Sequence, residues 1–188
     1  MISFKEFINK SEELGNYISV DVADFTEPQK ATLAFLDTMS GKATPNLHCT
    51  IVYSPTTSVP PETIQSYLDF HYANSDFPKT ARIVDVKKFD APQDADGNRP
   101  DAATLVLALE SEYLETLHKV LVKEFDLVHT YDKLSPHVSI RYNISHKDCE
   151  EAMKRLKGMI GVRSLSGLNT VTMTALRSAK IIKDWANK

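Results

Sequence analysis

The chain has 188 residues, with 22 Lys and Arg against 25 Asp and Glu, which gives a formal net charge of −3. Proteins that hold long DNA or RNA through its backbone carry a basic surplus, so this balance argues against a long nucleic acid and leaves room for a small phosphate ligand. The hydrophobic fraction of 42% is enough to bury a core, and we expect one domain over residues 1–188 with two internal lobes.

The sequence shows no pattern typical of a zinc site, a signal peptide or a membrane span. Two cysteines, Cys49 and Cys149, cannot form a zinc site by themselves, and we expect Cys49 to be a buried thiol. Charges at Lys5 and Glu6 argue against a signal peptide, and no stretch approaches the roughly 18 apolar residues that a membrane span needs. We therefore expect a protein of the reducing cytoplasm with no membrane partner.

The first half of the chain alternates helix and strand signals. Residues 3–14 have an amphipathic pattern that predicts a short helix ending at Gly15. Further along, apolar–polar alternation predicts strands, and Thr or Pro at capping positions predicts helix starts. In chain order we expect strand 17–22, helix 26–39, strand 47–53, helix 60–72 and strand 81–89.

The second half repeats this order. Residues 90–101 are rich in Asp and Pro and predict a loop or a long hairpin turn. The elements expected after it are strand 102–109, helix 112–125, strand 136–142, helix 146–157 with Ser145 as N-cap, and strand 169–176. The repeat predicts an α+β fold of two pseudo-symmetric lobes, each with an antiparallel sheet flanked by helices, around a central cleft.

Two short segments of the chain match each other. Residues 46–53 and 135–142 both read apolar-His-x-(Thr/Ser)-apolar-x-Tyr, with Pro136 in the apolar position of the second copy. Side chains on a strand alternate between its two faces, so His48 shares a face with Thr50, and His137 with Ser139. Two such strands facing each other would bring two imidazoles and two hydroxyls to one point.

This set of groups suits the cleavage of a phosphodiester. One imidazole can remove a proton from the attacking oxygen while the other protonates the leaving oxygen, and both titrate near neutral pH. The two hydroxyls can donate to the non-bridging phosphate oxygens, and the scheme needs neither a metal nor another cofactor. A single His-x-Thr would more often have no chemistry, but two copies in the same context favour catalysis. The remaining histidines lack this context and are expected to be structural or exposed: His71, His118, His129 and His146.

The paired motifs and the order of elements over roughly residues 17–176 resemble the 2H phosphoesterases. The resemblance implies a bilobal fold and metal-independent action on 2′,3′-cyclic or 2′–5′ linkages and related nucleotide phosphodiesters. It further implies that His48 and His137 are the general acid/base pair, and that Thr50 and Ser139 donate to the phosphate.

A Tyr near the N-terminus and a Trp near the C-terminus resemble the phage-encoded members of this class, which degrade the cyclic di- and trinucleotide messengers of the CBASS defence. The resemblance implies hydrolysis of 3′–5′ bonds in the host cytoplasm, with attack by a ribose 2′-OH on its own 3′-phosphate. Tyr17 and Trp185 would then cap bases, although Trp185 could instead pack against the body of the protein. Arg141 should face the same side as His137, where it would bind phosphate or form a salt bridge at the rim.

One position departs from the phage pattern. We expect an acidic residue between the last strand and Trp185, but residues 170–183 contain none, Ala179 stands in that stretch, and Asp184 is the nearest acid. Two alternatives to a phosphodiesterase of cyclic oligonucleotides stay open. One is an RNA-end enzyme acting on 2′,3′-cyclic phosphates or 2′–5′ linkages, and the other is a protein that sequesters cyclic nucleotides without cleaving them.

Overall fold

A computed structural model describes residues 14–57, 59–74, 80–92, 100–128, 133–160 and 167–181. Strands and helices alternate along these residues, largely where their capping and periodicity predict them. The strands are β1 (Leu14–Val22), β2 (Lys42–Ala43), β3 (His48–Thr57), β4 (Thr80–Asp90), β5 (Ala103–Glu110), β6 (His137–Ile144) and β7 (Thr170–Lys180). The helices are α2 (Glu27–Leu33), α3 (Pro61–Asn74), α4 (Glu112–Glu124) and α5 (His146–Lys157), with a 3-10 helix η1 (Ala34–Thr38) after α2.

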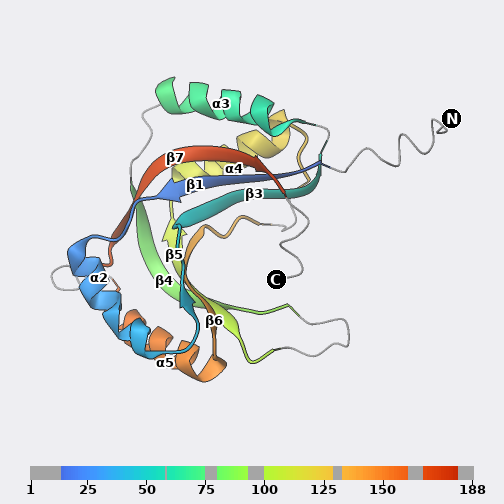
Figure 1. The fold of residues 1–188 in the computed structure, drawn as a ribbon. Helices are drawn as coiled ribbons and strands as arrows, with labels where there is room; N and C mark the ends of the chain where they lie inside the picture. Colours follow the sequence, from blue (N-terminus) through green and yellow to red (C-terminus); the bar gives the residue numbers. More distant parts are fainter. Residues whose placement is uncertain are drawn as a thin grey trace.

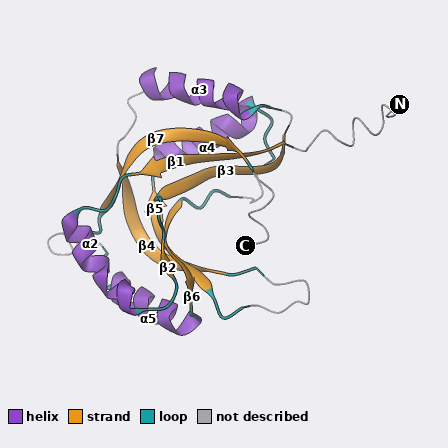
Figure 2. Cartoon of the chain, in the orientation of Figure 1, coloured by secondary structure: helices purple, strands orange, loops and turns teal. Residues whose placement is uncertain are grey.

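The strands form one antiparallel sheet in the order β2-β6-β5-β4-β7-β1-β3. This confirms the α+β class, but the sequence predicted two sheets where the structure has one, because β4 pairs with β7 through residues 80–82 and 170–172. Figure 1 shows the sheet curved into an arc. The helices lie outside this arc (Figure 2). We call the concave side of the sheet the inner face; the central cleft stays a prediction.

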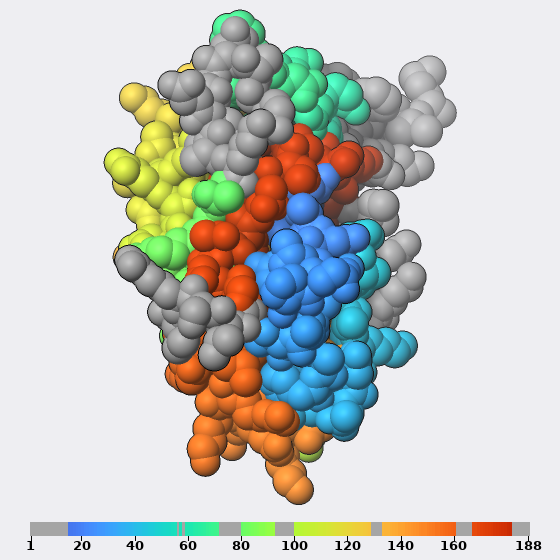
Figure 3. Space-filling view, turned by 90° about the vertical axis from the view of Figure 1, so that its left-hand side faces the viewer, coloured from blue at the N-terminus to red at the C-terminus, as the bar shows by residue number. Residues whose placement is uncertain are grey.

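Each half of the chain contributes three long strands to the sheet, and the halves exchange the third one. β4 ends the first half but pairs with β5, while β7 ends the second half and pairs with β1. We call β3-β1-β7 the first lobe and β6-β5-β4 the second lobe, since the strands follow in an equivalent order from the β4–β7 pair toward either edge of the sheet. Figure 3 shows one result of the exchange, the C-terminal strand β7 lying beside the N-terminal segment.

Several predicted boundaries hold and others shift. The Ser145 hydroxyl accepts a hydrogen bond from the backbone N–H of Asp148 and caps α5 as expected. β3 continues past Pro55, where the sequence predicted its end; β3 is the edge of the sheet, and an edge strand tolerates the missing N–H of proline. The two-residue strand β2 was not predicted. The helix expected over 3–14 lies outside the described residues except for Leu14, which with Gly15 already belongs to β1.

The core lies between the outer face of the sheet and the helices. Cys49, Val138 and Cys149 are fully buried in it, which confirms the prediction for Cys49. Val106 and Ala108 of β5 are buried too but do not belong to this core, since they pair with Ser139 and His137 and share their inner face. Of the helices described, none has both the length and the apolar content needed to cross a bilayer.

Candidate active site

The structure holds the two motif histidines in the same way. Nδ1 of His48 lies 3.0 Å from the carbonyl oxygen of Asn46, and Nδ1 of His137 lies 2.7 Å from the carbonyl oxygen of Ser135. A carbonyl oxygen can only accept, so each Nδ1 carries the proton and donates it. Each imidazole is therefore oriented by the backbone two residues before it, and Nε2 is left for proton transfer.

The curvature of the sheet brings the two motif strands together. β3 and β6 stand near opposite ends of the strand order, yet they contact each other. The backbone N–H of His137 donates to the thiol of Cys49, which directly follows His48. The two imidazoles are also close enough for the charge of His48 to lower the pKa of His137. The sequence prediction that the motifs meet is thus matched by the geometry.

Burial and nearby cations favour the neutral form of His137. Its pKa is lowered, first by burial and then by the charges of His48 and Lys87, while its hydrogen bond to Ser135 opposes the shift. Lys87 reaches this position from β4, the strand that the first half of the chain contributes to the second lobe. A neutral imidazole accepts a proton through Nε2, so His137 is suited to act as a base.

The hydroxyl of Thr50, the motif hydroxyl of the first lobe, is hydrogen-bonded to the phenol of Tyr17. The phenol oxygen of Tyr17 lies 3.0 Å from Oγ1 of Thr50, and the rings of Tyr17 and His48 are 5.9 Å apart at 80°. Burial raises the pKa of Tyr17 to about 12, so the phenol stays protonated at neutral pH. Thr50 and Tyr17 together can present an O–H donor on the inner face, and Ser139 stands half-buried at the equivalent position of the second lobe.

A β-bulge follows each motif at the same place. Ile51 of β3 and Ile140 of β6 are the extra residues, each directly after the motif hydroxyl. A bulge shifts the alternation of side chains by one residue. The tyrosine that ends each motif is therefore returned to the inner face: Tyr53 pairs directly with Tyr17, and the phenol of Tyr142 is close enough to raise the pKa of Tyr17.

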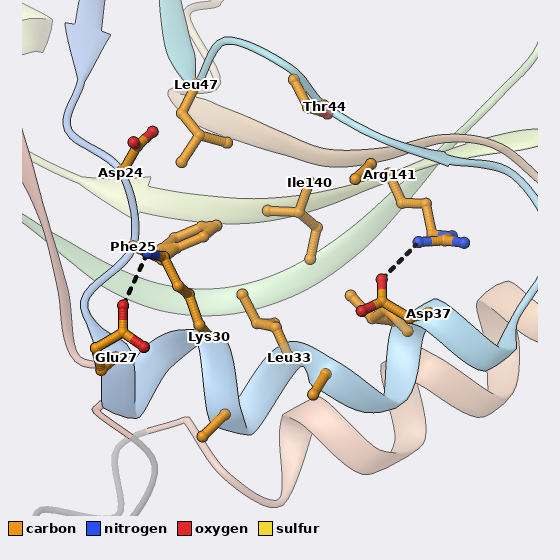
Figure 4. A pocket seen from close by; sticks show the side chains of 14 residues that line it. Asp24, Phe25, Glu27, Lys30, Leu33, Asp37, Thr44, Leu47, Ile140 and Arg141 are labelled. Carbon is orange, nitrogen blue, oxygen red and sulfur yellow. Dashed lines mark hydrogen bonds and ion pairs between the residues drawn. The ribbon is translucent and has the colours of Figure 1, made fainter.

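Because of the bulge, the prediction that Arg141 faces the same side as His137 is wrong. Arg141 is only 5% exposed and points to the outer side together with Ile140 (Figure 4). Its Nε donates to the carbonyl oxygen of Ser40 at 2.6 Å, and Nη2 donates to the carbonyls of Met39 at 2.8 Å and Gly41 at 3.2 Å. Arg141 thus holds the chain that follows η1 and does not reach the motif hydroxyls.

A pocket of about 670 Å³ lies on this outer side, between α2, η1 and β6 (Figure 4). Its walls include Phe25, Leu33, Leu47 and Arg141, and none of the four motif residues lines it. The pocket and the motif histidines therefore lie on opposite faces of β6. We place the candidate active site at the histidines, because the pocket offers no matching pair of proton-transfer groups.

Two cations occupy equivalent places on the inner face, and sequence reasoning missed both. Arg177 of β7 stands opposite Ser19, the strand neighbour of Thr50, and Lys87 of β4 stands opposite Val106, the strand neighbour of Ser139. Both side chains are exposed, and Arg177 is hydrogen-bonded to Asp21. In the sequence, the alternation of exposed and apolar residues over 80–90 and 170–180 was the available signal for these two cations. They reach the site because β4 pairs with β5 and β7 pairs with β1, each a strand from the other half of the chain.

The remaining predicted residues fall in three groups. Ala179 stands directly opposite Tyr17 on β7, so the position where an acid was expected does lie on the inner face. Trp185 and His129 lie outside the described residues. The other histidines belong to helices α3, α4 and α5 and do not join the site: His71, His118 and His146.

The curved antiparallel sheet with two facing His-x-(Thr/Ser) strands is the arrangement that the resemblance to the 2H phosphoesterases predicted. Kluyveromyces marxianus Usb1 has a similar structure, with a TM-score of 0.53 at 10% identity, covering 89% of this chain and 94% of that chain. The chain belongs to the family of the anti-CBASS protein Acb1, whose family model matches residues 15–164. This confirms the resemblance to the phage anti-CBASS proteins that was predicted from the Tyr near the N-terminus and the Trp near the C-terminus.

The likeness to Usb1 shows the fold alone, because the sequence identity is low. Usb1 solved with uridine monophosphate has a TM-score of 0.51 at 10% identity, with the same coverage of 89% and 94%. The chain has no match among curated protein sequences.

Proposed function

We propose that the protein is a metal-independent phosphodiesterase that cleaves 3′–5′ bonds of cyclic di- or trinucleotide messengers and so counters CBASS in the host cytoplasm. The observation that carries the proposal is that His48 and His137 make equivalent hydrogen bonds. In each, Nδ1 donates to a backbone carbonyl oxygen and Nε2 is left for proton transfer. Membership of the Acb1 family supports the class of substrate.

In the proposed reaction His137 is the base and His48 the acid. His137 removes the proton from a ribose 2′-OH, whose oxygen attacks the phosphorus of its own 3′-phosphate while the bond from phosphorus to O5′ breaks. His48 gives its Nε2 proton to O5′, so the ring opens to a linear product with a 2′,3′-cyclic phosphate and a 5′-OH. Thr50 and Ser139 donate to the non-bridging oxygens, which carry the charge of the transition state.

The surroundings of the two imidazoles support this assignment. Burial and Lys87 lower the pKa of His137 and so favour its neutral form at neutral pH. Asp21 lies directly opposite His48 across β1 and β3, and its carboxylate is hydrogen-bonded to Arg177. Tyr17 and Trp185 are proposed to cap bases, in line with the resemblance to the phage enzymes.

An overnight incubation with 3′,3′-cyclic GMP–AMP in EDTA, read by chromatography, tests the proposal. We expect ring opening by the wild type and none by His48→Ala or His137→Ala, with unchanged circular dichroism. A substrate with 2′-deoxyribose at the cleaved linkage should stay intact, because it lacks the attacking oxygen. Retained turnover in either histidine variant would refute the mechanism. An unchanged but bound ligand would indicate sequestration, and cleavage of linear 2′,3′-cyclic ends alone would indicate an RNA-end enzyme.

A further inference from the structure

Phe89 of β4 is a large apolar side chain that stays 40% exposed beside the candidate active site. Its sequence neighbour Lys88 contacts Glu150 of α5 on the outer side, so alternation along β4 places Phe89 on the inner face with Lys87. The rings of Phe89 and His137 lie 4.7 Å apart at 79°. An exposed aromatic ring therefore stands against one of the two proton-transfer groups.

A comparison of equivalent strand positions in the two lobes shows that Phe89 is an asymmetric feature of the site. In the first lobe Tyr17 contacts His48, and its neighbour on β7 is the small Ala179. In the second lobe the aromatic ring comes instead from the third strand, since Thr104 stands on β5 and Phe89 is opposite it on β4. Among the described residues, the ring of Tyr17 thus contacts His48 and the ring of Phe89 contacts His137.

A phosphodiester has one nucleoside on each side of its phosphorus. With the phosphorus between His48 and His137, one nucleoside extends over the first lobe toward Tyr17 and the other over the second lobe toward Phe89. A base stacked on Phe89 would cover apolar surface that is now exposed to water. Lys87, two residues away on the same face, would face the sugar-phosphate chain.

We propose that Phe89 is the base-stacking residue of a nucleotide subsite in the second lobe, with Lys87 as its phosphate-facing cation. The inference rests on the proposed function, because that function sets the phosphorus between the histidines. It goes further by assigning a second nucleoside position to a strand that carries neither motif.

Binding separates this subsite from the cleavage reaction. Affinity for 3′,3′-cyclic GMP–AMP is measured by calorimetry in a His48→Ala background, which keeps the ligand intact. We expect Phe89→Leu to weaken binding by about fivefold to a hundredfold, the range for loss of one base–aromatic stack, and Phe89→Tyr to retain affinity within about twofold. Phe70→Leu is the matched control, because Phe70 is 66% exposed on α3, away from the inner face.

Unchanged affinity in Phe89→Leu would overturn the subsite, as would an equal loss in Phe70→Leu. If Phe89 only positioned His137, Phe89→Leu in the otherwise wild-type enzyme would lower kcat with KM unchanged, and this too would overturn it. Binding that depends on Phe89 without turnover by the wild type would refute the proposed cleavage and keep the subsite. Turnover by the wild type, together with an affinity that does not depend on Phe89, would refute the subsite and keep the proposed cleavage.

Discussion

Replacing Arg141 by Met tests whether this buried guanidinium supports the fold or the phosphate. The side chain is 5% exposed and donates to the three carbonyls of residues 39–41. A hydrogen bond to a charged group contributes about 1.5–3 kcal/mol. The three bonds share one guanidinium, and water can reach the exposed residues Ser40 and Gly41. We therefore expect a loss of about 3 kcal/mol in the free energy of unfolding, not the full sum.

Urea denaturation followed by circular dichroism measures this loss. With a typical slope of about 2 kcal/mol per molar urea, the midpoint should fall by about 1.5 M. Asp37→Asn is the control, since Asp37 is 81% exposed and 3.8 Å from the guanidinium, and it should cost less than about 0.5 kcal/mol. Turnover of folded Arg141→Met should stay within about threefold of the wild type. Unchanged stability with a large fall in turnover would refute the structural role of Arg141.

Three further predictions concern the inner face and one turn. Lys87→Gln removes a charge that lowers the pKa of His137, so the pKa should rise and the acidic limb of the kcat/KM profile should move to higher pH. Tyr17→Phe removes the phenol bonded to Thr50 and should lower turnover by about fivefold, the equivalent of about 1 kcal/mol for one hydrogen bond. Gly41→Ala should destabilise by about 2 kcal/mol in urea titrations, because the backbone has φ +83° and a Cβ would collide with the Tyr142 carbonyl oxygen.

Each of these three predictions has a control variant. Lys88→Gln changes a lysine on the outer side of β4, and its pH profile should match the wild type; an equal shift would show a general charge effect. A Tyr17→Phe/Thr50→Val double variant should lose no more turnover than Thr50→Val alone, and additive losses would contradict the shared O–H donor. Gly158→Ala places a Cβ 3.6 Å from its nearest neighbour and should be neutral, so an equal loss there would undo the explanation for Gly41.

The residues whose roles are set by neighbours in the chain could be recognised from sequence. The spacing of His48 and Thr50 puts them on one face of a strand, and each imidazole is held by a carbonyl only two residues away. The Ser145 cap depends on a backbone N–H three residues further on. The repeated order of elements likewise predicted the α+β class and the pairing of the two motifs.

Arg141, Phe89 and Lys87 took their places only in the folded sheet. A bulge arises when two residues of one strand face one residue of the partner, so the turn of Arg141 away from His137 depends on β5 as well as on β6. Phe89 and Lys87 reach the second lobe because β4 pairs with β5 and not with β1. Periodicity within a segment predicts which side chains share a face, but strand partners and their register are set by contacts between distant residues, and these placed the cations and the aromatic ring beside the histidines.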